Sequence, residues 1–208
     1  MLTVALTGGI ACGKSVVATI LREKGCCLHS ADRSAHELMA PDGAAYPPVV
    51  ARFGNGILAS DGTIDRKKLG AIVFADPAAR AALDSIVHPR VLDRVREVAA
   101  EQRRIGRCRI FVSEAALVFE AGFALFFDRI VVVSCREDVR LARLMARDGI
   151  GRHEALRKIG SQLPQAEKTG RADYLIDASG TLAETVDRTE RVYAMLVRDE
   201  ELRDRREP

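Results

Sequence analysis

A chain of 208 residues with 48% hydrophobic residues can bury the core of one globular domain, or of one domain that carries a large insertion. Its 32 basic and 29 acidic residues nearly cancel, which excludes the strong field that draws a whole surface to nucleic acid or to a membrane. No apolar run is long enough to span a bilayer, and the N-terminal run lacks the basic leader of a signal peptide. We therefore expect a protein that acts on small molecules, with no nucleic-acid or membrane partner, as a monomer or small homo-oligomer.

The first predicted elements are a strand, a glycine loop and a helix. Residues Leu2–Thr7 are apolar and rich in β-forming side chains, and they run into Gly8-Gly9. Residues Lys14–Lys24 then carry apolar side chains at helical spacing.

Four more strands are predicted along the chain, and helical patterns follow most of them. This alternation predicts an α/β fold of three αβα layers, in which a five-stranded parallel sheet has helices on both faces. The predicted strands are Cys26–His29, Arg109–Ser113, Ile130–Ser134 and Asp173–Asp177, and the main helices after them are Glu137–Ala146 and Leu182–Val197.

The alternation is interrupted twice. After the second strand, three helical stretches are separated by glycine-rich turns, and they predict a helical insertion: Arg33–Met39, Arg66–Phe74 and Pro77–Arg104. A second, arginine-rich interruption after the fourth strand predicts a mobile lid. The expected organisation is a nucleotide-binding core over residues 1–32, 108–146 and 171–198, a helical acceptor-binding domain over 33–107, a lid over 147–170 and a flexible charged tail over 199–208.

The cysteines are odd in number and none has Cys-x-x-Cys spacing. This pattern predicts reduced thiols rather than bridges or zinc ligands, and hence a cytoplasmic location. One thiol, Cys12, lies beside Lys14, where a lowered thiol pKa is conceivable, although a simple role as a small loop residue is favoured. The five cysteines are Cys12, Cys26, Cys27, Cys108 and Cys135.

Residues Gly8–Ser15 satisfy the P-loop pattern in full, between a predicted strand and a predicted helix. Glycines allow the N–H groups of such a loop to converge on phosphate oxygens, and the next helix presents its positive end to the same anion. Lys14 is expected to reach the β- and γ-phosphates of ATP, and Ser15 to coordinate Mg²⁺. The predicted ATP-binding residues of the loop are Gly9, Ile10, Ala11, Cys12, Gly13, Lys14 and Ser15.

A P-loop alone does not separate kinases from switches or motors. The guanine-reading motif Asn-Lys-x-Asp is absent, and the helical insertion follows the second strand, where kinases of small acceptors bind their substrates. These features favour a small-molecule kinase.

Further motifs resemble those of the dephospho-coenzyme A kinase family, in the order of that family and along nearly the whole chain. The opening Ala5–Ile10 with Gly13-Lys14-Ser15 is similar to the start of these enzymes. The other matching motifs are Ala31-Asp32, Phe53-Gly54, Asp61–Arg66, Val73-Phe74, His88-Pro89, Leu117–Glu120 and Ala172-Asp173.

The resemblance implies ATP-dependent phosphorylation of the ribose 3′-hydroxyl of dephospho-coenzyme A, the last step of coenzyme A synthesis. It implies that Asp32 is the catalytic carboxylate, which accepts the hydroxyl proton or holds Mg²⁺, and that Arg66 and His88 contact the acceptor. Each has a structural alternative: Asp32 as a helix N-cap, Arg66 as a solvated helix start, and His88 as a turn residue before Pro89.

Three arginines lie at i, i+3 and i+7 of one predicted helix, so they share a face that could clamp phosphate: Arg140, Arg143 and Arg147. The resemblance assigns Arg143 to catalysis and Arg147 to ATP, and we expect Arg140, where relatives often have Gln, at the acceptor. The alternative is surface pairing, for example of Arg140 with Glu137. Glu120 is either a supporting residue of the site or a surface charge.

Four positions depart from the family pattern: Ser30 replaces an Asp, His36 an Arg, Ala116 a Pro and Ala178 an Asn. They leave two alternatives open. A nucleoside or nucleoside-monophosphate kinase would share the core, the insertion and the lid. A non-catalytic nucleotide sensor would bind ATP without turnover.

Overall fold

The computed structural model describes residues 1–204 and contains two compact units. One unit comprises Met1–His29 together with the chain from Ala99 onward, and the other comprises Ser30–Val98. The first unit contains the sheet and also residues 147–170, the predicted lid. The second unit is mainly helical.

Five strands form one sheet in the order β2-β3-β1-β4-β5. The pairings of β1 with β3 and β4, and of β4 with β5, are parallel, so the predicted α/β fold with a five-stranded parallel sheet is confirmed. The strands are β1 (Leu2–Gly8), β2 (Cys27–Ser30), β3 (Ile110–Glu114), β4 (Arg129–Ser134) and β5 (Tyr174–Asp177).

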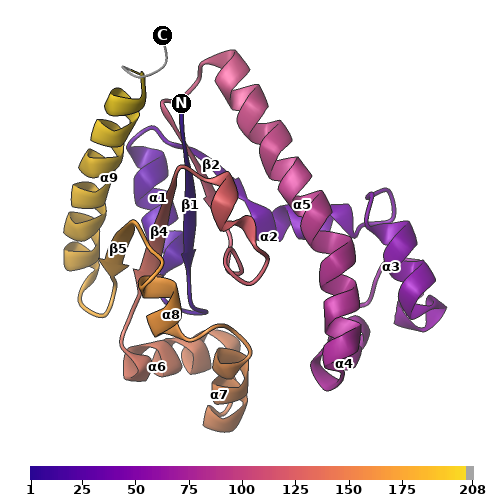
Figure 1. The fold of residues 1–208 in the computed structure, drawn as a ribbon. Helices are drawn as coiled ribbons and strands as arrows, with labels where there is room; N and C mark the ends of the chain where they lie inside the picture. The colour runs from indigo at the N-terminus through magenta and orange to yellow at the C-terminus, as the bar shows by residue number, and fades with distance from the viewer. Residues whose placement is uncertain (205–208) are drawn as a thin grey trace. The chain divides into compact units, whose positions relative to one another are not determined.

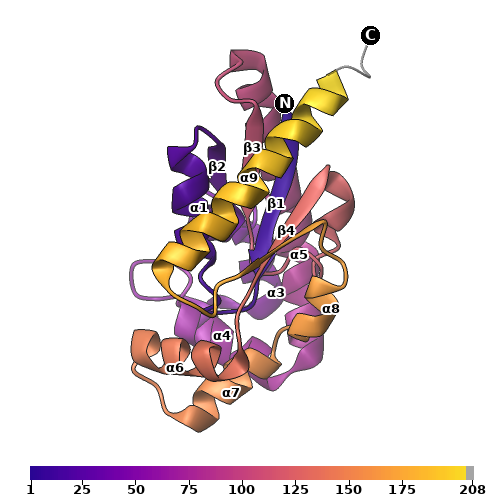
Figure 2. The same ribbon diagram turned by 90° about the vertical axis from the view of Figure 1, so that its left-hand side faces the viewer.

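Helices α1 (Lys14–Glu23) and α9 (Leu182–Asp204) pack against each other and cover one face of this sheet (Figures 1 and 2). Alternate residues of β1 point into the core between the sheet and these two helices, because side chains of a strand alternate between the two faces of a sheet. The core there contains Leu6, Val17, Leu21 and Leu196, none of which is exposed.

The chain between β4 and β5 forms three further helices, which lie near the C-terminal ends of β1 and β4 (Figures 1 and 2). They are α6 (Glu137–Asp148), α7 (Arg152–Gly160) and α8 (Gln165–Thr169). Ligands of open parallel sheets bind outside the carboxyl ends of the strands. These helices therefore border the region where a site is expected.

The helical unit contains α2 (Ala31–Leu38), α4 (Arg66–Ala75) and most of α5 (Pro77–Ile105), all near their predicted positions. It also contains α3 (Tyr46–Phe53), which the sequence did not predict. Its two prolines lie in the first turn, where a missing N–H group costs no hydrogen bond, so they start the helix rather than prevent it. No helix within residues 1–204 is both long enough and apolar enough to cross a membrane.

The predicted flexible tail over 199–208 is wrong for its described part, because α9 continues to Asp204. Glu200 is only 3% exposed and its carboxylate lies 2.5 Å from the Arg109 guanidinium, while Asp199 accepts from Arg129 at 2.7 Å. Both arginines lie at or beside the starts of strands, so only the folded sheet brings these charges together. Residues 205–208 lie outside the described residues.

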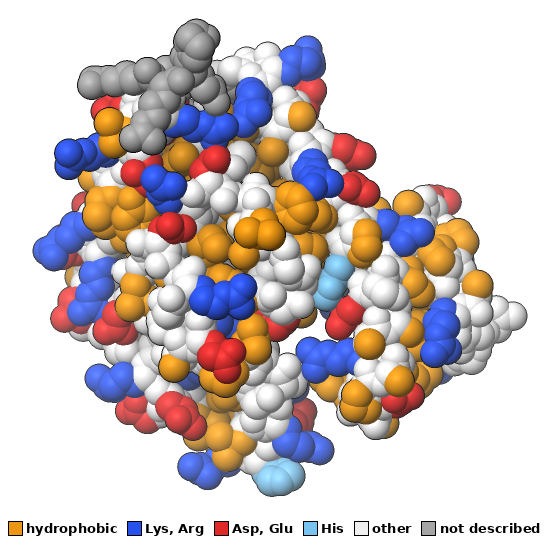
Figure 3. Space-filling view, viewed as in Figure 1, with side chains coloured by type: hydrophobic (Ala, Val, Ile, Leu, Met, Phe, Trp, Pro, Cys, Tyr) orange, Lys and Arg blue, Asp and Glu red, His pale blue; other side chains and the backbone are white. Residues whose placement is uncertain are grey.

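Basic and acidic side chains are interleaved over the visible face of the sheet-containing unit (Figure 3). Opposite charges are thus balanced over this face as well as in the overall composition.

The prediction that all cysteines are reduced thiols is wrong for one pair. Cys27 and Cys108 form a disulfide across 81 residues of sequence, with their Cα atoms 5.9 Å apart. Cys27 begins β2 and Cys108 precedes β3, and these strands are neighbours in the sheet. The spacing of cysteines in the sequence contained no sign of this adjacency. Cys12, Cys26 and Cys135 are free and buried.

Candidate active site

The glycine loop connects β1 to α1, as the P-loop pattern predicted. Gly13 directly precedes α1 with φ at 96°, a conformation that side chains other than glycine rarely adopt. The N–H groups at the start of α1 therefore face the loop, where the helix end favours an anion.

The two residues expected to act on ATP follow at once. Lys14 donates from Nζ to the carbonyl oxygens of Gly8, at 3.0 Å, and Gly9, at 3.2 Å. Its ammonium group thus lies over the loop. Ser15 is exposed at the second position of α1, so its hydroxyl is accessible.

Arg140 lies against the glycine loop and is only 6% exposed. Its Nε donates to the carbonyl oxygen of Ile10 at 3.1 Å. A Cβ atom at Gly9 would lie 2.7 Å from the Arg140 guanidinium carbon, so the glycine allows this close approach. The alternative of a surface pair between Arg140 and Glu137 is therefore wrong.

Gln162, between α7 and α8, also contacts the loop. Its Oε1 accepts from the backbone N–H of Ile10 at 2.8 Å and from Nη2 of Arg140 at 3.2 Å. The predicted lid segment is thereby bonded to the N–H of Ile10 directly and to its carbonyl oxygen through Arg140. The Gln162 side chain thus accepts from an N–H group of the phosphate-binding loop. The sequence analysis did not identify this residue.

Two more residues of the segment follow Gln162 at three-residue spacing. Gln165 donates from Nε2 to the carbonyl oxygen of Cys135 at 2.9 Å, and its Oε1 accepts from the Cys12 thiol at 3.4 Å. Lys168 donates to the carbonyl oxygen of Ala116 at 3.1 Å. The three-residue spacing of Gln162, Gln165 and Lys168 was the one signal in the sequence that could have indicated that these side chains point the same way.

Glu120 and Lys168 form an ion pair inside the sheet-containing unit, with Nζ and Oε1 2.7 Å apart. The Lys168 side chain is 1% exposed and that of Glu120 16% exposed. Glu120 also accepts from the N–H of Leu163 at 3.1 Å. The surface-charge alternative for Glu120 is wrong, since this carboxylate holds the lid segment at two points.

Replacing Lys168 with methionine is expected to lower the free energy of unfolding by about 3 kcal/mol, because it leaves the Glu120 carboxylate buried without its counter-charge. Urea unfolding measures this change. The matched control is Lys158→Met, since Lys158 is 35% exposed and pairs with Asp148 at the surface, where such pairs contribute about 0–1 kcal/mol. Equal losses for the two variants would contradict the burial argument.

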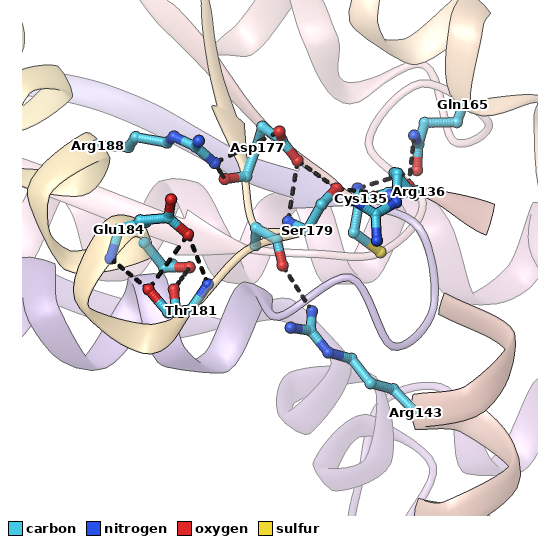
Figure 4. Close-up of polar contacts among 11 residues, drawn as sticks. Cys135, Arg136, Arg143, Gln165, Asp177, Ser179, Thr181, Glu184 and Arg188 are labelled. Atoms are coloured by element: carbon cyan, nitrogen blue, oxygen red, sulfur yellow. Dashed lines mark hydrogen bonds and ion pairs between the residues drawn. The ribbon is translucent and has the colours of Figure 1, made fainter. Parts of the chain in front are cut away.

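Arg143 reaches the loop after β5 and donates from Nη1 to the carbonyl oxygen of Ala178 at 2.8 Å (Figure 4). The same nitrogen lies 3.9 Å from the Cβ position of Gly13, so Arg143 also borders the glycine loop.

Arg147 instead donates to Asp148 at 2.8 Å. Hydrogen bonds from Arg147 and Lys158 lower the pKa of Asp148 to about 2. Of the three arginines, the structure thus places Arg140 and Arg143 at the loop.

The loop after β5 is held by polar contacts of its own (Figure 4). Ser179 accepts from the N–H of Arg136 at 2.8 Å and donates to Asp177 at 2.5 Å. The Ala178 methyl group is buried, 3.6 Å from the Cβ position of Gly13. The departure at Ala178 therefore leaves this loop fixed beside the glycine loop.

Asp32 is exposed in the first turn of α2, directly after β2, and belongs to the helical unit. The N-cap of α2 is Ser30, which accepts from the N–H of Arg33 at 3.3 Å. The N-cap alternative for Asp32 is therefore wrong. The departure at Ser30 replaces an expected carboxylate with a helix cap.

The predicted acceptor residues Arg66 and His88 also lie in the helical unit. Arg66 is exposed at the start of α4, and its Nη2 lies 2.6 Å from Nε2 of His36. His88 lies within α5, 3.4 Å from Asp84 one turn earlier, and the helix continues through Pro89. The turn alternative for His88 is wrong.

His36 is expected to titrate below the ordinary range of histidine. Burial lowers the pKa of His36 and the Arg66 guanidinium lowers it further, while Asp32 opposes both. The pKa of His36 in the folded protein lies below 6.5, so the unfolded chain takes up the proton first as the pH falls. Stability is therefore unaffected above pH 6.5 and decreases as the pH falls from there toward the pKa of the folded protein. NMR titration measures this pKa, and Arg66→Gln should raise it.

The control for that titration is Arg52→Gln, because Arg52 belongs to the same unit but lies over the Phe53 ring. It should leave the His36 pKa unchanged. A wild-type value at or above 6.5 would contradict the prediction.

A parallel sheet with a complete P-loop after its first strand, bordered by buried and half-buried arginines, defines a P-loop nucleotide-binding protein of the kinase type. A family model described as dephospho-CoA kinase matches residues 2–184. The chain belongs to the dephospho-CoA kinase family.

Individual relatives agree with this membership. A dephospho-CoA kinase of Geobacter sulfurreducens is 43% identical over 191 residues, which cover 92% of this chain and 96% of that protein. Among solved structures, dephospho-CoA kinase from Campylobacter jejuni has a TM-score of 0.68 at 27% identity, covering 92% of this chain and 95% of that chain. A Thermus thermophilus protein has a TM-score of 0.78 at 29% identity, with 93% and 96% covered.

Proposed function

We propose that this protein transfers the γ-phosphoryl group of ATP to the ribose 3′-hydroxyl of dephospho-coenzyme A, which yields coenzyme A and ADP. The observation that carries the proposal is the family match over residues 2–184, which includes a P-loop with its lysine and serine in place. The same reaction is the final step of coenzyme A synthesis.

ATP binding is assigned to the glycine loop and its neighbours. The N–H groups of residues 9–15 surround the phosphates, and the Lys14 ammonium moves from the carbonyl oxygens of Gly8 and Gly9 to the β- and γ-phosphates. Arg143, beside Gly13, stabilises the charge that develops on the transferred group. Arg147 exchanges its hydrogen bond to Asp148 for one to ATP.

Mg²⁺ accompanies ATP in this proposal, and the residues present fit it. The described residues contain no group of three or more His, Cys, Asp or Glu that could hold a metal ion. Mg²⁺ in phosphoryl-transfer sites needs only one or two protein oxygens beside phosphates and water, and the exposed Ser15 hydroxyl and Asp32 carboxylate are oxygens of this kind. The ion supplies positive charge that neutralises the phosphates during transfer.

Asp32 orients the acceptor hydroxyl and takes its proton as the phosphoryl group is transferred. Arg66, His88 and Arg140 are assigned to binding of the phosphorylated acceptor. The His36 to Arg66 contact holds the Arg66 fork in one orientation, which suits a bidentate donor to phosphate.

The deciding experiment is coupled ADP release with Mg·ATP. Dephospho-coenzyme A is compared with AMP, CMP, adenosine and no acceptor, and mass spectrometry identifies the product. Turnover with dephospho-coenzyme A alone supports the proposal. Turnover with a nucleoside monophosphate would replace the substrate and keep the class, and ATP binding without turnover would establish a nucleotide sensor instead.

A further inference from the structure

Two free cysteines meet at the glycine loop. Cys12 belongs to the loop and Cys135 directly follows β4, and their sulfur atoms are 3.4 Å apart. Cys12 is 0% and Cys135 2% exposed. The proposed phosphoryl transfer uses neither thiol, so the pair has no role in the reaction as described.

The surroundings of the pair favour a thiolate at Cys12. A hydrogen bond from the Cys135 thiol lowers the pKa of Cys12, burial opposes it, and the charges of Arg140 and Lys14 lower it further. The pKa of Cys135 is raised, chiefly by its bond to Cys12 and by burial. Cys26 lies in a different environment, where burial alone raises the thiol pKa to about 12. Only Cys12 is thus prepared for attack on an oxidant.

Gln165 contacts both cysteines. Its Oε1 accepts from the Cys12 thiol at 3.4 Å. The same oxygen accepts from the N–H of Cys135 at 3.4 Å, and Nε2 donates to the Cys135 carbonyl oxygen at 2.9 Å (Figure 4). The lid segment therefore covers the pair. An opening of this segment would admit a small oxidant.

We propose that Cys12 and Cys135 are a reversible redox site, which a hydroperoxide converts into a disulfide that impairs the ATP-binding loop. The inference goes beyond the proposed kinase activity. It requires two thiols in contact on the phosphate-binding loop, and it does not depend on the identity of the acceptor.

The chemistry balances with hydrogen peroxide as the oxidant. The Cys12 thiolate attacks one peroxide oxygen, the O–O bond breaks, and the other oxygen leaves as water after protonation, so that Cys12 becomes a sulfenic acid. The Cys135 sulfur then attacks the Cys12 sulfur and loses its proton, and the sulfenic oxygen leaves as a second water. Two thiols are oxidised by two electrons, and one peroxide is reduced to two waters.

Bond formation would change the loop. A disulfide requires the two sulfur atoms to approach from 3.4 Å to about 2.05 Å. Cys12 must move toward the end of β4 and lose its bond to Gln165, and the neighbouring N–H groups of the loop move with it. Hydrogen bonds to phosphate weaken steeply when distance or angle changes on this scale, so we expect ATP affinity to fall at least about tenfold.

The test uses the full-length protein treated with hydrogen peroxide. Mass spectrometry of the intact chain and of its peptides looks for the loss of two hydrogens and for a link between Cys12 and Cys135. Calorimetry measures ATP affinity before treatment, after treatment and after dithiothreitol. We expect the link, the tenfold loss of affinity and its recovery with dithiothreitol.

Two variants separate this site from the other thiols. Cys135→Ser keeps the Cys27–Cys108 disulfide but cannot form the link, so peroxide should add oxygen to Cys12 in this variant and remove no hydrogens. Cys26→Ser should respond like the wild type. A link through Cys26, a linked protein with unchanged ATP affinity, or a loss of two hydrogens in peroxide-treated Cys135→Ser would each overturn the proposal. Because ATP binding is the readout, failure of the kinase assay would leave this test intact.

Discussion

Replacing Lys14 with alanine is expected to lower kcat/KM for dephospho-coenzyme A phosphorylation by about 10³-fold, because removal of one preorganised charge from a transition state typically costs 10²–10³ in rate. The transferred phosphoryl group carries its charge on oxygens that the Lys14 ammonium is placed to contact. Coupled ADP release measures the loss.

The matched control is Lys24→Ala, just beyond the other end of α1. Lys24 pairs with Glu190 at 2.5 Å, and its side chain is 37% exposed. Its replacement should leave kcat/KM within about twofold of the wild type, since an exposed ion pair contributes little. Near-normal turnover in Lys14→Ala would remove this lysine from the mechanism.

Lys14 also bonds two carbonyl oxygens of the loop, so its loss could disturb the loop itself. Urea unfolding of the variant distinguishes the two effects. We expect a loss of stability of only about 1 kcal/mol, the size of an ordinary hydrogen-bond contribution, which is too small to explain a thousandfold loss of turnover in a folded protein.

Asp32→Asn is expected to lower kcat by about 10³-fold while the affinity for ATP stays within a few-fold of the wild type. A positioned general base contributes about 10²–10⁴ to the rate, and asparagine keeps the shape of the side chain but accepts no proton. Removal of a negative charge from the first turn of α2 costs only about 0.3–1 kcal/mol, so the helix should remain folded.

The control for that variant is Asp42→Asn, because Asp42 is an exposed acid of the same helical unit. It should retain full activity. If Asp32→Asn kept the wild-type kcat, the carboxylate would have no part in proton transfer. A large loss of ATP affinity would show that Asp32 acts mainly on the metal and nucleotide and not as the base.

Regular periodicity made most of the fold predictable. The five strands were located to within a residue or two, because buried strands of a parallel sheet appear as short apolar runs between turn residues. The glycine loop was equally clear, since all its residues are adjacent in sequence. Helix α3 was missed because prolines normally argue against a helix, and here they occupy its first turn.

The details of the site were less predictable, because they depend on contacts between distant segments. The contact of Arg140 with Ile10, 130 residues away, was not predicted. Gln162 was not considered, although it bonds the same residue. The partner of a polar residue in a lid-like segment cannot be predicted from sequence periodicity, because it depends on the path by which the segment returns to the sheet.

By itself, the sequence determined the fold class, the phosphate-binding loop and the family, because these depend on local patterns and on motifs in a fixed order. The tertiary structure decided which long-range partners each side chain has: the Cys27–Cys108 disulfide, the buried Glu120–Lys168 pair, and the meeting of Cys12 with Cys135. The physical reason is that parallel strands become neighbours only through crossover connections. Residues far apart in the chain therefore come together without leaving a pattern in the sequence.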